Sequence, residues 1–167
     1  SVVVALNIVP FAGIAFLWFI GVVRDRIGDA EDRFFATVFL GSGLLFVAML
    51  YVGAASGSGL LLSATHTLPS GSWTYGRDLT FALLTVYSIR MGAIFTICTT
   101  SLFARLDLAP QWLTILGYTT GLVLLVASGF VPWLEIVFPA WVFVLSVYIL
   151  AATRPHPESG DLASPEW

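Results

Sequence analysis

Five long runs of apolar residues divide this chain, and each is long enough to cross a lipid bilayer as a helix. A crossing helix needs roughly 20 mostly apolar residues, because the hydrocarbon layer is about 30 Å thick and a helix rises about 1.5 Å per residue. The runs predict transmembrane helices over residues 2–23, 34–55, 79–104, 112–131 and 134–153. We therefore expect an all-α fold, a polytopic membrane helix bundle.

The composition agrees with a membrane protein. Of the 167 residues, 58% are hydrophobic and 10% are charged, whereas about a quarter of a soluble domain is charged. We expect one transmembrane helical domain over residues 1–153, followed by a polar, proline-rich C-terminal tail over residues 154–167 that has no apolar periodicity.

The charged residues exclude some partners and predict an orientation. A net charge of −3 offers no basic face to nucleic acid. All seven basic residues are arginines, which indicates a GC-rich bacterial genome. Arg90 falls inside a predicted helix and is not counted. Of the other six, five fall on one side of the predicted membrane and one on the other. We therefore expect the bacterial cytoplasmic (inner) membrane, with the N-terminus outside and the C-terminus cytoplasmic. The five are Arg24, Arg26, Arg33, Arg105 and Arg154, and the one on the outer side is Arg77.

Small and polar residues inside the runs predict helix contacts. Pro10 predicts a kink in the first helix, where Asn7 is expected to bond to the freed backbone or to a neighbouring helix. Small residues recur every four positions in the third run and make a ladder on which another helix can lie close; they are Ser88, Gly92, Thr96 and Thr100.

The fourth run contains a GxxxG spacing at Gly117 and Gly121. This spacing favours close helix packing, and within a multi-pass chain the partner is usually a helix of the same chain. It indicates homodimerisation only weakly. Cys98 is the only cysteine, so an intrachain disulfide is excluded and we expect it to pack as a small hydrophobic residue.

Arg90 is the residue that a membrane helix tolerates least. Counted from Leu79, it lies about 16 Å into the third run, near the middle of the membrane. A charge there costs about 2.5 to 3.5 kcal/mol on insertion scales. The carboxylates of the chain lie far from it, near the two boundaries of the membrane: Asp78, Glu135 and Asp107.

Three explanations for Arg90 stay open. It pairs with an acid or with carbonyls of another subunit, it extends towards a lipid phosphate with help from Tyr87, or it binds an anionic substrate in a water-filled cavity. The connection over residues 56–78 is expected to be a long loop, because glycine, serine and Pro69 punctuate it. His66 in that loop stands alone, so we expect no metal site.

The sequence carries no HExxH, GxSxG or Walker A pattern and no pair of intramembrane carboxylates, so we expect no enzyme and no cofactor. The function that we expect is a noncatalytic accessory or structural subunit of a larger bacterial membrane protein complex, packing against partner helices. The alternative is a small homo-oligomeric transporter or pore for an anionic or lipid substrate that uses Arg90. The expected partners are the lipid bilayer and other membrane subunits, and a homo-oligomer is also compatible with the sequence.

One segment carries a resemblance. PFAGIAFLWFIGVVRDRIGDAEDRFFATVFLGSGLLFVAML, Pro10 to Leu50, resembles an uncharacterised family of small bacterial multi-pass integral membrane proteins that is frequent in actinobacteria. The likeness covers about a quarter of the chain. It implies a bacterial origin and a membrane location, and it implies no activity. It also makes the turn that contains Arg24 and Arg26 a hypothetical interaction surface.

Overall fold

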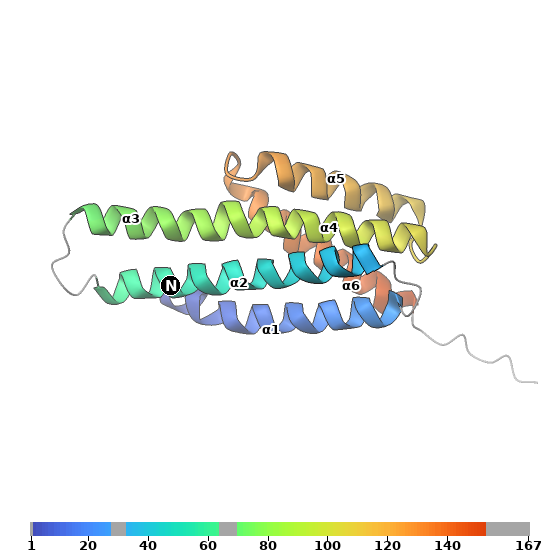
Figure 1. Ribbon diagram of the computed structural model, residues 1–167, viewed down its shortest axis with the longest axis horizontal. Coiled ribbons are helices and arrows are strands. Elements are labelled where there is room, and N and C mark those ends of the chain that lie inside the picture. Colours follow the sequence, from blue (N-terminus) through green and yellow to red (C-terminus); the bar gives the residue numbers. More distant parts are fainter. Residues whose placement is uncertain (1, 28–32, 64–69, 153–167) are drawn as a thin grey trace, which may run out of the picture.

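The computed structural model of this protein describes residues 2–27, 33–63 and 70–152, and its regular elements over these ranges are all helices (Figure 1). The all-α prediction is confirmed. The charged turn after Ile27, His66 and the C-terminal tail lie outside the described residues. The elements are α1 (Val2–Ile27), α2 (Arg33–Ser63), α3 (Ser70–Phe81), the π-helix η2 (Ala82–Tyr87), α4 (Ser88–Arg105), α5 (Gln111–Ala127), the 3₁₀-helix η3 (Pro132–Ile136) and α6 (Val137–Ala152).

Among the residues that the structure describes, four helical segments are long and apolar enough to cross a membrane, which makes this a multi-pass membrane protein. The fifth apolar helix, α5, has 17 residues, at the lower end of the length that a crossing needs. The four segments are Leu6–Ile27, Ala36–Ser63, Gly71–Arg105 and Trp133–Ala152.

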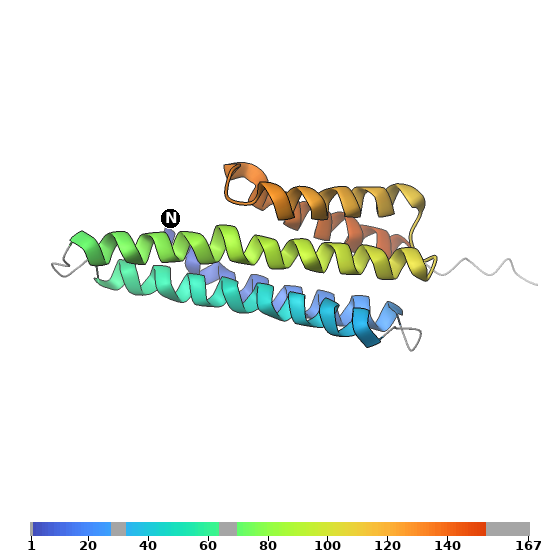
Figure 2. The ribbon, with the colours of Figure 1, turned by 45° about the horizontal axis from the view of Figure 1, so that its top comes forward.

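The two ends of the bundle differ in composition and in shape. We call the end where α1 and α4 finish, with Arg24, Arg26 and Arg105, the basic end, and the opposite end, where α2 finishes and α3 begins, the hairpin end. Figures 1 and 2 show α2 and α3 extending past α5 at the hairpin end. The 31 residues of α2 span about 46 Å, which exceeds the thickness of a hydrocarbon layer of about 30 Å.

The prediction of a long loop over residues 56–78 is wrong. α2 continues to Ser63 and α3 begins at Ser70, so glycines and serines that indicate a flexible connection lie in helices instead. Their small size explains this, because it lets two helices approach. A Cβ on Gly76 would lie 2.9 Å from Leu60, and one on Gly57 would lie 3.2 Å from Thr80.

The third helix is also longer than predicted. It begins at Ser70 instead of residue 79, and α3, η2 and α4 follow one another without a break to Arg105. Its middle, Ala82–Tyr87, widens into a π-helix. Smaller shifts affect the other helices: α1 continues to Ile27, α5 ends at Ala127, and η3 precedes α6 where the sequence predicts one span.

The core is an aromatic cluster contributed by four helices. Phe16 of α1, Phe46 of α2, Phe95 of α4 and Phe138 of α6 pack around one another. The ring centroids of Phe16 lie 5.0 Å from those of both Phe46 and Phe95, and Phe46 lies 4.7 Å from Phe138. Such spacings are favourable for tilted and edge-to-face aromatic pairs. The cluster therefore joins helices that are distant in the sequence.

Pro10 lies inside α1, as the sequence indicates, and its own carbonyl is held by a neighbouring helix. The hydroxyl of Tyr51 on α2 donates to the Pro10 carbonyl oxygen at 3.0 Å. A Cβ on Gly13 would lie 2.4 Å from the Tyr51 hydroxyl oxygen, so the glycine makes room for this tyrosine. The bond fastens α1 to α2 towards the hairpin end.

Tyr51→Phe is expected to lower the free energy of unfolding by about 0.6 kcal/mol, the mean measured for hydrogen bonds between helices in a membrane protein. Unfolding in mixed micelles checks this value. Tyr75→Phe is the matched control, since Tyr75 is exposed and its hydroxyl has no partner among the described residues. An equal loss in both variants would contradict the role given to the Tyr51 hydroxyl.

Candidate functional site

Arg90 lies one helical turn along α4 from the level of the turn between α5 and α6. Val86, one turn before Arg90, lies against Gly129 in the α5–α6 turn, where a Cβ would come within 3.5 Å of it. Gly129 has a φ of 90°, which a glycine adopts readily and which closes this turn. Arg90 is thus about 6 Å along the helix from the level of this turn and about 22 Å from Arg105 at the basic end.

Exposed aromatic residues flank both ends of α5. Trp112 at its first turn is 56% exposed, and Phe130 and Trp133 beyond its last turn are 83% and 76% exposed. Exposed tryptophans are typical of the two membrane–water interfaces, and α5 between them is about 25 Å long. A layer about 30 Å thick, counted along the helix from Arg105, reaches residue 85. This is the level of Val86, which lies against Gly129 in the turn between α5 and α6. On this count from Arg105, Arg90 lies in the third of the layer nearest the hairpin end.

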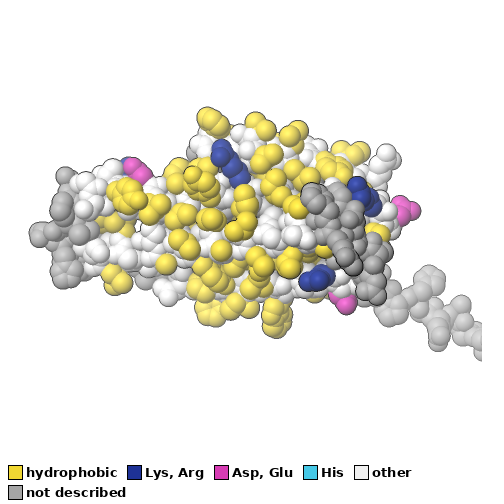
Figure 3. All heavy atoms as spheres, in the orientation of Figure 1, with side chains coloured by type: hydrophobic (Ala, Val, Ile, Leu, Met, Phe, Trp, Pro, Cys, Tyr) yellow, Lys and Arg dark blue, Asp and Glu magenta, His cyan; other side chains and the backbone are white. Residues whose placement is uncertain are grey.

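The side chain of Arg90 is exposed on the bundle surface and has no hydrogen-bond or ion-pair partner within residues 2–27, 33–63 and 70–152. Asp78 is the acidic residue nearest to Arg90 along the same helix, and its carboxylate pairs with Arg77 at 3.0 Å. Figure 3 shows a mainly hydrophobic face with basic side chains at one end and again between the two ends.

The predicted ladder on α4 is a packing face. Ser88, Thr96 and Thr100 are buried, and each hydroxyl donates to the carbonyl oxygen four residues earlier, for example Thr96 to Gly92 at 2.9 Å. Gly92 itself faces the ring of Phe138, where a Cβ would lie 3.2 Å away. The hydroxyls of Ser88, Thr96 and Thr100 thus donate to the backbone of their own helical segment.

The GxxxG pair packs inside the chain. Gly117 of α5 faces Thr100 of α4, and a Cβ on Gly121 would lie 2.5 Å from Ile97 and 3.3 Å from the carbonyl oxygen of Ala93. These contacts draw α5 onto α4. The two glycines are thus occupied by a helix of their own chain, as the same-chain alternative predicts.

The remaining predicted contact residues lie near the two ends of the bundle. Asn7 and Tyr87 are exposed, Asn7 on α1 and Tyr87 one turn from Arg90 towards the hairpin end. Arg24 is exposed at the basic end. Arg26 is half-buried, and its Nη2 donates to the carbonyl oxygen of Ile149 at 3.3 Å. The structure therefore brings Tyr87 beside Arg90 and leaves the others apart from it.

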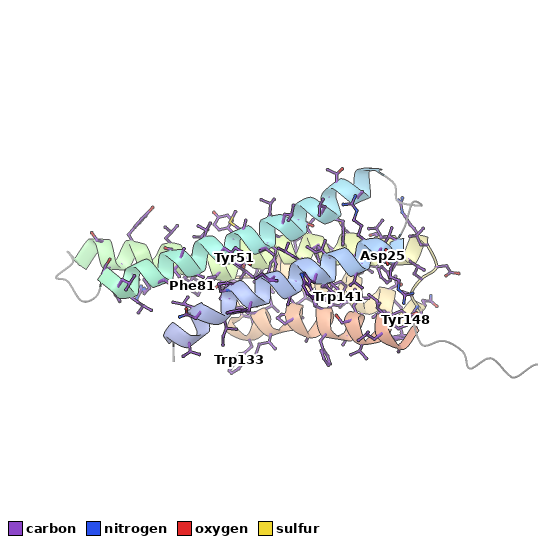
Figure 4. All side chains as sticks on the ribbon, turned by 90° about the horizontal axis from the view of Figure 1, so that it is seen from below. Asp25, Tyr51, Phe81, Trp133, Trp141 and Tyr148 are labelled. Carbon is purple, nitrogen blue, oxygen red and sulfur yellow. The ribbon has the colours of Figure 1, made fainter. Side chains whose placement is uncertain are left out.

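Between α1 and α6 lies a groove that the sequence does not predict. Its volume is about 630 Å³, and α1 and α6, seen in Figure 4, form its walls. The floor is formed by Phe16, Phe46 and Phe138 of the aromatic cluster, together with Ser88 and Ile89 of α4. The lining residues are Ala12, Ala15, Phe16, Phe19, Phe46, Leu50, Leu84, Ser88, Ile89, Glu135, Phe138, Pro139, Val142, Phe143 and Ser146.

The groove is mainly apolar, and Glu135 is the charged residue among those that line it. Glu135 in η3 is exposed at the hairpin-end rim and has no partner among the residues that the structure describes. Ser88, on the floor, lies two positions before Arg90, and a helix turns about 100° per residue, so Arg90 projects roughly 160° away from the groove. Arg90 thus points away from the groove that Glu135 of η3 helps to line.

A second, much smaller space lies between α4, α5 and α6. Thr99, Thr114 and Trp141 help to line it, and at about 10 Å³ it has room for about one water molecule. The Nε1 of Trp141 finds no acceptor among the described residues. Those residues also hold no group of three or more side chains suited to bind a metal.

Comparison with protein-family models, curated proteins and solved structures finds no match for this chain.

Proposed function

We propose that this chain is a noncatalytic subunit of a larger bacterial membrane complex and that a transmembrane helix of a partner protein lies in the groove between α1 and α6. The observation that carries the proposal is the groove itself. It opens in the part of the bundle that the membrane surrounds, and its exposed walls include Ala12, Ala15 and Pro139. Small residues are enriched where helices meet in membranes, because they allow close backbone approach.

Glu135 indicates the chemistry of the partner helix. A carboxylate at the rim of an apolar groove favours a cation close by, and Coulomb attraction is stronger there than in water. We therefore propose that the partner helix carries an arginine or lysine at the level of Glu135. A helix with apolar residues elsewhere on that face would then contact Phe143 and the aromatic floor.

The alternative function, a transporter or pore that uses Arg90, has less support. Arg90 is exposed on the bundle surface and lines neither the groove nor the small space beside Trp141. A transport path needs several polar groups that converge on one route. The hydroxyls of Thr96, Thr99 and Thr100 instead donate to carbonyls of α4.

We further propose that the membrane is the bacterial inner membrane, with the basic end in the cytoplasm. Arg24, Arg26 and Arg105 lie at the basic end, whereas Arg77 lies at the hairpin end beside Asp78. Arginines are enriched on the cytoplasmic side of such proteins. In this orientation the hairpin end, where α2 finishes and α3 begins, lies on the side of the membrane opposite to the cytoplasm.

A photoreactive amino acid at Ala15 in the tagged full-length chain tests the groove. In native membranes it is expected to capture one protein, through a peptide from a transmembrane segment that has an arginine or lysine within about two turns of the crosslink. Glu135→Gln should reduce that capture, because it removes the charge at the rim. Mass spectrometry of the crosslinked peptide provides the measurement.

The same probe at Ala48 is the control, since Ala48 is an exposed alanine of α2 outside the groove. It should not capture the protein that Ala15 captures. Capture of lipid alone at Ala15, or the same proteins at both positions, would contradict the proposal.

A further inference from the structure

We propose that Arg90 and Tyr87 bind the phosphate of a glycerophospholipid in the membrane leaflet at the hairpin end. The proposal concerns the face of α4 opposite the groove, so it does not rest on the partner helix proposed above. Both side chains are exposed, and Tyr87 lies one turn from Arg90 in the direction of the hairpin end. The two residues define the phosphate site.

The depth of Arg90 brings lipid phosphate within reach. The Val86–Gly129 contact sets the level of the aromatic α5–α6 turn about one helical turn away from Arg90. An arginine side chain keeps its aliphatic stem in the hydrocarbon and extends its charged head towards the interface. From this depth the guanidinium can reach the headgroup level, which it could not do from the middle of the membrane.

The chemistry of the two side chains suits a phosphodiester. The planar guanidinium of Arg90 can donate two parallel hydrogen bonds to phosphate oxygens, and these charge-assisted bonds are stronger than neutral ones. Tyr87, which is 52% exposed, presents a hydroxyl donor closer to the headgroups. A tyrosine near the interface is also well placed to keep its ring in the hydrocarbon and its hydroxyl in the polar layer.

The acids of the chain do not compete for Arg90. Glu135 of η3 lies at the groove rim, on the side of α4 opposite to Arg90. Asp78 lies about 18 Å along the helix from Arg90 and pairs with Arg77. Lipid surrounds an exposed side chain at this depth, and every glycerophospholipid of that leaflet carries a phosphate. The phosphate is therefore the anion that the position of Arg90 selects.

Native mass spectrometry of the purified full-length protein released from phosphatidylglycerol nanodiscs tests the site. Arg90→Leu is expected to weaken retention of the lipid about tenfold, since a hydrogen bond to a charged group contributes enough free energy for a factor of that size. Arg90→Lys should retain an intermediate amount, because a lysine keeps the charge and loses the fork of donors. Tyr87→Phe should also retain less lipid than the wild type.

Arg77→Leu is the matched control, since it removes the same charge from an exposed residue at the hairpin end that pairs with Asp78, and it should retain lipid as the wild type does. Nanodiscs of a galactosyl diacylglycerol, which has no phosphate, should give weak retention that Arg90→Leu does not change. Inorganic phosphate added as a competitor should leave phosphatidylglycerol in place.

Three results would overturn the proposal. They are equal retention of phosphatidylglycerol by wild type, Arg90→Leu and Arg90→Lys, displacement of the lipid by inorganic phosphate, and loss of a bound protein from Arg90→Leu with its lipid unchanged. The last result would indicate an acidic partner at Arg90. None of them alters the expected crosslink from Ala15, so the two proposals can fail separately.

Discussion

Replacing Phe95 by alanine is expected to lower the free energy of unfolding by about 3 kcal/mol, the low end of the range for phenylalanine in a protein core. Phe95 has no exposed surface, and its ring contacts those of Phe16 and Phe39 at centroid distances of 5.0 Å and 4.9 Å. The loss comes mainly from packing, because separated helices in a bilayer still lie in apolar lipid. Unfolding of the protein in mixed micelles measures it.

Phe11→Ala is the control for Phe95→Ala, because it removes the same atoms from a side chain that is 71% exposed on α1. Its effect should stay within about 0.5 kcal/mol. If the two variants unfolded alike, the aromatic cluster would not be the element that holds the helices together.

The helices could be predicted from the sequence where burial in lipid decides the structure. Runs such as residues 2–23 and 34–55 have too few charges to be anything but membrane helices, and α1 and α2 contain them. The prediction failed over residues 56–78, where glycine and serine indicate a loop. Gly57 and Gly76 lie in helices, where the absence of a side chain lets a neighbouring helix pack closely. Thr80 packs against Gly57, and Leu60 packs against Gly76. A pattern within one segment does not report such a neighbour.

The candidate site could be predicted only in part. Arg90 stands out in the sequence, but its depth depends on which residue of another helix lies level with it, and the Val86–Gly129 contact supplies that information. Counting from Leu79 used a helix start later than the one that the structure shows, which is Ser70. The groove was missed for a similar reason: Phe16 and Phe138 meet only after the bundle forms.

Gly117→Ala is expected to lower the free energy of unfolding by about 2 kcal/mol, within the range for overpacking. A Cβ at this position would lie 2.1 Å from the Oγ1 of Thr100 and 3.0 Å from its Cβ. Thr100 cannot turn away easily, because it is β-branched and its hydroxyl donates to the Thr96 carbonyl at 2.7 Å. The added methyl group therefore pushes α5 away from α4, and thermal unfolding in bicelles should show the loss.

Gly41→Ala gives the same chemical change with the opposite expected sign. No atom lies within 4 Å of a Cβ at Gly41, so alanine there gains up to about 1 kcal/mol of helix propensity without a clash. The double variant Gly117→Ala with Thr100→Ala should recover part of the loss, because it removes Oγ1 and Cγ2 from the contact while leaving the Thr100 Cβ position filled. Contacting sites of this kind are not additive, and strictly additive losses would show that Thr100 is not what Gly117 accommodates.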